Sequence, residues 1–141
     1  MMKYTLRQYR GFTLIELMIV LVILGLIMGI VGPQAMKYLG KGKTQSTKVQ
    51  IENLSAALDM YRLEVGSYPE DLKALVAAPS GARGWNGPYL KKGDVPKDGW
   101  NNDYQYKRKS TNGQPYELMS FGADGAAGGE GEDADISLWD K

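Results

Sequence analysis

The chain of 141 residues contains no cysteine and no histidine. Without cysteine, no disulfide can stabilise a small domain, and thiol chemistry is excluded. Without histidine, the commonest general base, the Ser-His-Asp triad and the usual zinc ligands are missing. Catalysis would have to rest on carboxylate, Lys, Tyr or Ser side chains, and no convergent spacing of Asp or Glu pairs supports a hydrolase. We therefore expect that the protein is not an enzyme.

The chain also has little net charge of either sign. Its 17 basic and 16 acidic side chains give a formal net charge of +1, so we expect no nucleic-acid partner. The charges are unevenly placed, however. Lys3, Arg7 and Arg10 precede a long apolar run without any acid among them, and the last dozen residues are acidic.

Residues 12–31 form this apolar run, in which Thr13 and Glu16 are the only polar side chains. At a rise of about 1.5 Å per residue, a helix of this length spans roughly 30 Å, enough to cross a bilayer. Because basic residues flank only its N-terminal side, the positive-inside rule places that end in the cytoplasm. The alternative, a cleaved secretory signal peptide, fits poorly because residues 28–33 do not resemble an A-x-A site.

Glycine and proline weaken the helical pattern near the end of the run. Gly25, Gly29 and Gly32 precede Pro33, whose ring removes one backbone donor and clashes with the preceding turn. We expect a kink or a local loosening here, although lipid would enforce helix. Gly25 and Gly29 also form a G-x-x-x-G pair, which is either a helix-packing face or a chance spacing.

Beyond Pro33 the helical pattern resumes and becomes amphipathic. Five apolar residues spaced 3, 4, 3 and 4 form one stripe that requires a partner surface: Ile51, Leu54, Leu58, Tyr61 and Val65. Gly66, with Pro69 just beyond it, predicts that the helix ends at Val65. An unbroken helix from Phe12 to Val65 would be roughly 80 Å long.

The remaining sequence predicts a second short helix and a long loop. The helix is expected to begin at Pro69, with acids in its first turn, and to end near Ala78. Residues 79–102 are rich in Gly, Pro, Asn, Lys and Trp and predict an ordered loop. Its internal packing is assigned to aromatic side chains: Trp85, Tyr89 and Trp100. The alternative is that these side chains form a binding surface.

Alternating residues then predict a small antiparallel sheet. Residues 103–108 and 116–121 read as two strands of a hairpin, with turn chemistry at residues 111–113, and residues 136–139 could close the sheet. The predicted fold class is α+β. One long N-terminal helix, apolar and then amphipathic, packs on a small C-terminal domain with a short antiparallel sheet and a Gly/Asp-rich loop.

The stretch Arg10 to Leu17, R-G-F-T-L-I-E-L, closely resembles the N-terminal signal of type IV pilin-like proteins. The resemblance implies that a prepilin peptidase cuts between Gly11 and Phe12 and methylates the new amine of Phe12. Glu16 then occupies the family's acidic position, and Pro33 also keeps the family spacing. It further implies a removed leader at 1–11, a transmembrane and assembly stem at 12–35, and a periplasmic head at 36–141.

The carboxylate of Glu16 is costly in lipid and needs a reason. Cleavage creates an ammonium group at Phe12, one helical turn away, so the two charges can pair within one subunit or between neighbours. Glu16 would then set the register in which stems pack into a fibre, and we assign assembly to Phe12, Glu16 and Pro33. The alternative is that Glu16 only extends to the membrane interface.

The C-terminal residues 120–125, 128–129 and 133–136, in a head without cysteine, resemble those of the major pseudopilins of type II secretion. The resemblance implies a homopolymeric fibre subunit that is held in the inner membrane before assembly and in a periplasmic pseudopilus afterwards. Its partners would be minor pseudopilins and an inner-membrane platform with a cytoplasmic ATPase, and fibre growth would drive export of folded proteins. The alternatives are a type IV pilin for adhesion, motility or DNA uptake, and a membrane-anchored calcium-binding module that never polymerises.

Residues 122–135 form an acidic, glycine-rich loop. Hard oxygen ligands on a flexible loop favour calcium over transition metals, and the EF-hand pattern is missing. A bound calcium would hold the loop in place of the missing disulfide, as the resemblance also implies. We assign the side chains of Asp124 and Asp133, then Asp135, and the backbone carbonyl of Phe121 as ligands. The alternative is a solvated acidic loop without metal.

Overall fold

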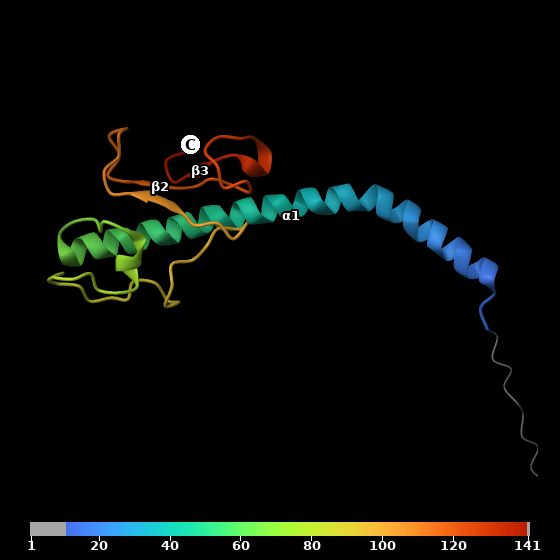
Figure 1. The fold of residues 1–141 in the computed structure, drawn as a ribbon, viewed down its shortest axis with the longest axis horizontal. Helices are drawn as coiled ribbons and strands as arrows, with labels where there is room; N and C mark the ends of the chain where they lie inside the picture. The colour runs from blue at the N-terminus through green and yellow to red at the C-terminus, as the bar shows by residue number, and fades with distance from the viewer. Residues whose placement is uncertain (1–10, 141) are drawn as a thin grey trace, which may run out of the picture. The chain divides into compact units, whose positions relative to one another are not determined.

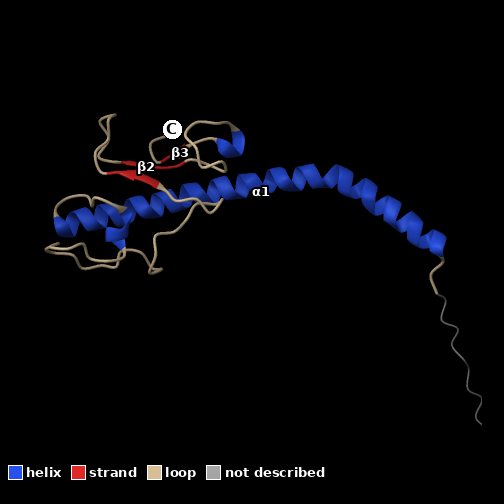
Figure 2. Cartoon of the chain, in the orientation of Figure 1, coloured by secondary structure: helices blue, strands red, loops and turns tan. Residues whose placement is uncertain are grey.

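The computed structural model describes residues 11–140, so the predicted leader apart from Gly11 lies outside the described residues. The chain forms two compact units, which meet between Tyr38 and Leu39. The α+β prediction is confirmed: one long helix, α1 (Leu14–Val65), precedes a small antiparallel sheet (Figure 1). Short 3-10 helices and loops make up most of the rest (Figure 2).

Helix α1 keeps helical backbone through Pro33. The kink or loosening predicted between Gly25 and Pro33 therefore does not interrupt the helix in this structure. One proline removes a single i to i−4 hydrogen bond, and the bonds of the neighbouring residues hold the turn. The predicted end is confirmed, because Gly66 has φ 93° and its N–H donates to the Arg62 carbonyl at 2.8 Å.

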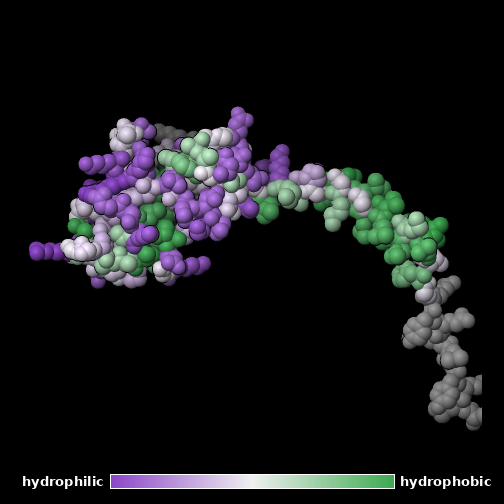
Figure 3. Space-filling view, viewed as in Figure 1, coloured by the Kyte–Doolittle hydropathy of each residue, from purple (hydrophilic) through white to green (hydrophobic). Residues whose placement is uncertain are grey.

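The first unit consists of the apolar part of α1. Its large hydrophobic side chains are exposed from Phe12 to Met36, and they form the continuous apolar surface in Figure 3. By length and composition, α1 is able to cross a membrane. Exposed apolar surface of this extent is unfavourable in water, so this segment requires lipid or protein around it.

The second unit has its core between α1 and the sheet. Ile51, Leu54, Leu58 and Tyr61 of the predicted stripe are buried. They pack in one cluster with side chains from the C-terminal domain: Tyr116, Leu118 and Ile136. The amphipathic half of α1 is therefore the central element of the head.

The sheet has the order β1-β2-β3, and both pairs are antiparallel. Its strands are β1 (Gln105–Lys107), β2 (Glu117–Ser120) and β3 (Ile136–Ser137). The hairpin and its closure are as predicted, but the strands are shorter. Tyr104 and Tyr116 lie just outside the hydrogen-bonded strands and are nevertheless buried. The alternation of residues in the sequence therefore shows which side chains face the core. It continues past the residues that form strand hydrogen bonds.

The predicted second helix is reduced to a 3-10 helix, η1 (Leu72–Leu75), and another, η2 (Gly131–Asp133), was not predicted. The N-cap is Asp71, whose carboxylate accepts from two backbone N–H groups. A further helical turn does not form because residues of the long loop (79–102) donate hydrogen bonds to the carbonyl groups that this turn would need. Trp85 Nε1 donates to the Ala74 carbonyl and the Tyr89 N–H to the Leu75 carbonyl, both at 2.8 Å. The predicted packing of this loop is confirmed: Trp85, Tyr89 and Trp100 lie against the core.

Candidate functional site

The predicted processing junction lies at the exposed start of the described chain. Gly11, Phe12 and Thr13 precede α1, and 87% of Phe12 is exposed. A non-helical, exposed segment is the form in which a peptide bond is accessible to a peptidase. Pro33, the other predicted assembly residue, lies inside α1.

Glu16 and Thr13 form a capping box at the start of α1. The Glu16 carboxylate accepts from the Thr13 N–H at 2.9 Å and from the Thr13 hydroxyl at 3.1 Å, and the Glu16 N–H donates to that hydroxyl at 3.2 Å. This is the reciprocal pattern that satisfies free donors at a helix N-terminus. Sequence reasoning missed it, although the T-x-x-E spacing at the start of an apolar run is its recognised signal.

The acidic loop folds back so that its two ends lie together. The Ala123 N–H donates to the Glu132 carbonyl at 2.8 Å. Gly122 has φ 70°, and a Cβ there would lie 2.6 Å from the Glu132 carbonyl oxygen, so only glycine fits. The loop therefore brings residues 121–124 beside residues 132–135.

All three predicted ligand carboxylates lie in this loop, and those of Asp124 and Asp135 accept hydrogen bonds from backbone amides. Asp124 Oδ1 accepts from the Ala126 N–H, and both oxygens of Asp135 accept from the Gly128 N–H, each at 3.0 Å. Within residues 11–140, no three acidic side chains converge in a way that could hold a metal ion. Any ion bound here would need backbone carbonyls for part of its coordination shell.

A buried polar cluster that sequence reasoning missed anchors the first end of the loop. Asp98 is 8% exposed, and its carboxylate accepts from Ser120 Oγ at 2.5 Å and from the Asn102 N–H at 2.8 Å. Asn102 Nδ2 then donates to the Gly122 carbonyl at 2.8 Å. The sequence signal for this cluster is the segment of residues 98–102, Asp-Gly-Trp-Asn-Asn. Its Asp and Asn residues favour hydrogen bonds from side chain to backbone in turns.

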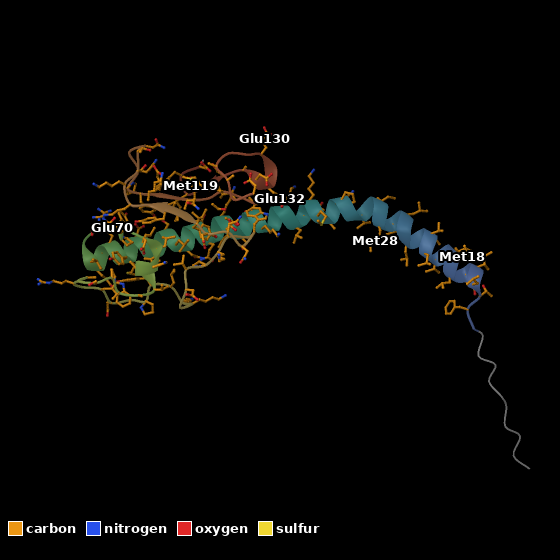
Figure 4. All side chains as sticks on the ribbon, in the orientation of Figure 1. Met18, Met28, Glu70, Met119, Glu130 and Glu132 are labelled. Carbon is orange, nitrogen blue, oxygen red and sulfur yellow. The ribbon has the colours of Figure 1, made fainter. Side chains whose placement is uncertain are left out.

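Two loops contact α1 beside this cluster, one through Gly99 and the other through Glu132. The Gly99 N–H donates to the buried Thr47 hydroxyl at 2.9 Å, and a Cβ at Gly99 would lie 2.7 Å from the Lys43 carbonyl oxygen. Glu132 lies against α1 at Gly40, whereas Glu130 points away from the helix (Figure 4). The acidic loop is thus coupled directly to the helix that carries the predicted stem.

Comparison with known proteins accounts for nearly the whole chain. Residues 6–32 match the family model described as "Prokaryotic N-terminal methylation motif", and residues 34–139 match "Type II secretion system (T2SS), protein G". A type II secretion system core protein G of Pseudomonas aeruginosa is 47% identical, over 96% of this chain and 98% of that protein. One from Vibrio cholerae is 41% identical, over 95% and 94%.

A solved structure agrees with the sequence matches. The major pseudopilin from the type 2 secretion system of enterohaemorrhagic Escherichia coli aligns with a TM-score of 0.58 and 29% identity, over 70% of this chain and 88% of that one. The long helix and the small three-stranded sheet are thus features of a known pseudopilin fold. The chain belongs to the type II secretion system protein G family.

Proposed function

We propose that the chain is the major subunit of a type II secretion pseudopilus, a homopolymer whose growth drives export of folded proteins across the outer membrane. The observation that carries the proposal is the match of both halves, the methylation motif at 6–32 and protein G at 34–139. The subunit is held in the inner membrane with its N-terminus in the cytoplasm. It joins minor pseudopilins in a periplasmic fibre, on a membrane platform driven by a cytoplasmic ATPase.

Maturation begins with cleavage between Gly11 and Phe12 by a prepilin peptidase, which methylates the amine of Phe12. The capping box supports the next step, because it places the Glu16 carboxylate 2.9 Å from the nitrogen of Thr13, the residue adjacent to that amine. In the mature chain we expect the ammonium of Phe12, one residue before this contact, to pair with the carboxylate of Glu16, within a subunit or between neighbours. Pairing removes the cost of an isolated carboxylate in lipid and sets the register of packed stems.

Calcium binding by the acidic loop is part of the proposal. The donors are all oxygens, which suits calcium, and the loop closure brings the backbone of residues 122–123 against that of residues 132–134. Positive φ angles at Gly125, Gly128, Gly129 and Gly131 turn backbone carbonyls in directions that other residues rarely allow. A bound calcium would hold the two ends of the loop together electrostatically, with Asp124 and Asp133 as the principal side chains.

Gene deletion tests the proposed function. In the source bacterium, loss of this chain should abolish export of the proteins that pass through the type II system, and a plasmid copy should restore it. A surface-pilus subunit would behave differently: its deletion would remove adhesion, motility or DNA uptake and leave export normal. That second result would overturn the proposal.

A further inference from the structure

Helix α1 carries a group of lysines, without any acid among them, shortly after its apolar run. A few uncharged residues follow the run, and Lys37, Lys41 and Lys43 come next. Lys37 and Lys41 are exposed, and Lys43 is half-buried. We call these three residues the basic collar. The chain has no acidic residue between Glu16 and Glu52, so no neighbour along the helix neutralises the collar.

The loops that pack beside the collar do not neutralise it either. Glu132 lies against Gly40, but its carboxylate accepts a hydrogen bond from Trp100 Nε1 at 3.3 Å. Within the part of the chain that the structure describes, neither Lys37 nor Lys43 forms an ion pair. Positive charge in this segment is therefore left for a partner outside the chain.

Chain connectivity keeps the collar close to the end of the apolar segment, whose exposed side chains require hydrocarbon around them. From Met36 to Lys43 the backbone is helical, so these residues span about 10 Å. That length is close to the Debye length of about 8 Å at physiological salt, and lysine side chains extend toward the polar surface of a membrane. Tyr38 is 71% exposed in the same segment, and tyrosine is enriched at membrane interfaces. The collar therefore lies within reach of lipid phosphate groups.

We propose that the basic collar binds the phosphate groups of anionic phospholipids, in the leaflet of the inner membrane that faces the periplasm. The inference rests on the proposed function, which holds the subunit in this membrane and removes a leader that contains Lys3, Arg7 and Arg10. After that cleavage, the basic side chains nearest to the apolar segment are those of the collar. The collar then supplies electrostatic attachment on the opposite surface of the membrane and holds the subunit at a fixed depth until it is extracted.

The lipid preference of the full chain tests the collar. The purified chain is reconstituted in phosphatidylcholine vesicles, and electron spin resonance of spin-labelled phosphatidylglycerol and spin-labelled phosphatidylcholine gives the ratio of their affinities for the protein. We expect a severalfold preference for phosphatidylglycerol that weakens at high salt. The collar variant, with Lys37, Lys41 and Lys43 replaced by glutamine, should lose most of this preference, because one lysine at an anionic surface contributes about fivefold in affinity. All forms keep the same N-terminus, so the difference between them reports the collar.

Three further variants separate charge from structure. Glutamine and lysine have similar helix propensities, but Lys43 is half-buried, so a second variant replaces only the exposed Lys37 and Lys41 and should lose part of the preference. Arginine at all three collar positions should retain it. The matched control replaces three exposed lysines elsewhere in the head, and its preference should equal that of the unsubstituted chain: Lys91, Lys92 and Lys109.

Two results would overturn the inference. One is an equal affinity of the unsubstituted chain for the two lipids. The other is a preference that the collar variant and the control variant retain alike; if the collar variant also forms no fibres, these lysines contact protein instead of lipid. The proposed function fails by a different measurement, because a deletion that leaves export normal would overturn it without changing the lipid preference of the purified chain.

Discussion

The carboxylate of Glu132 lies directly against Gly40 of α1, so that a methyl group at Gly40 would overlap it. Trp100 Nε1 donates to the same carboxylate at 3.3 Å. The segment of α1 beneath has low helix propensity, since residues 40–47 include two glycines, two threonines and a serine. The loops that pack on this segment therefore stabilise the helix as well as themselves.

Substitution of Gly40 by alanine separates these two effects. Alanine improves helix propensity by about 1 kcal/mol over glycine, but at Gly40 the methyl group displaces Glu132. At Gly42 nothing lies within 4 Å. We therefore expect Gly42→Ala to raise the melting temperature of the detergent-solubilised chain by about 4–8 °C, and Gly40→Ala to raise it less or lower it.

The control is the same pair of substitutions in a Glu132→Ala background. Without the glutamate, Gly40→Ala should become as stabilising as Gly42→Ala. A difference between the two glycines that persists unchanged in that background would show that Glu132 is not its cause.

Tyr104 has a buried hydroxyl without a hydrogen-bond partner among the described residues. Because an unpaired buried hydroxyl costs about 1–3 kcal/mol, Tyr104→Phe should stabilise the head by about 1 kcal/mol. The matched variant is Tyr116→Phe, which loses the 2.8 Å bond to Ser55 and should destabilise it by about 0.5–1.5 kcal/mol. Urea unfolding measures both, and a destabilised Tyr104→Phe would contradict the structure at this site.

Alkaline pH should destabilise the head through Tyr104 and Tyr106. Burial raises the pKa of Tyr104 well above its ordinary value of 10.0, and the Asp98 carboxylate adds to the effect; burial also raises the pKa of Tyr106. Above pH 10 these tyrosines lose their hydroxyl protons in the unfolded chain but keep them in the folded chain. The contribution of these tyrosines to the free energy of unfolding should be constant below pH 10 and should fall above it, by about 1.4 kcal/mol per pH unit for each such tyrosine. Tyr104→Phe should reduce this slope.

The helical half of the molecule was largely predictable from the sequence because its signals are local. The apolar stripe ending at Val65, the glycine stop at Gly66 and the hairpin all follow from spacing and turn chemistry. The helix predicted from Pro69 to Ala78 did not form at that length because of hydrogen bonds between residues that are distant in the sequence. Its continuation depends on carbonyls that Trp85 and Tyr89 occupy from more than ten residues away.

The candidate sites show the same division. The junction at Gly11 and the acid at Glu16 are readable because the motif is contiguous. The Asp98 cluster was missed because its partners, Ser120 and Gly122, come from a distant strand end.

Calcium binding predicts a stability change in a head fragment beginning at residue 36. At a calcium concentration a hundredfold above Kd, binding adds about 2.7 kcal/mol to the free energy of unfolding. A chelator should therefore lower the melting temperature, and Asp124→Ala should make it independent of calcium. Glu130→Ala, in the same loop but pointing outward, should retain the calcium response. An equal melting temperature with and without calcium would rule out the site.

Glu16 has two roles that one pair of variants separates. Glutamine can replace glutamate in a capping box but carries no charge, so Glu16→Gln keeps the box with Thr13 and loses the pairing with the Phe12 ammonium. We expect cleavage to proceed in both Glu16→Gln and Glu16→Ala, and export and fibre formation to fail in both. Normal fibres from Glu16→Gln would assign the residue to helix capping alone.

The identity of the mature N-terminus tests the account most directly. The chain is purified from membranes of cells that contain the prepilin peptidase, and its intact mass and N-terminal sequence are determined. The account predicts a chain that begins at Phe12 with one added methyl group on its amine. A chain that retains Met1 or begins at any residue other than Phe12 would contradict it.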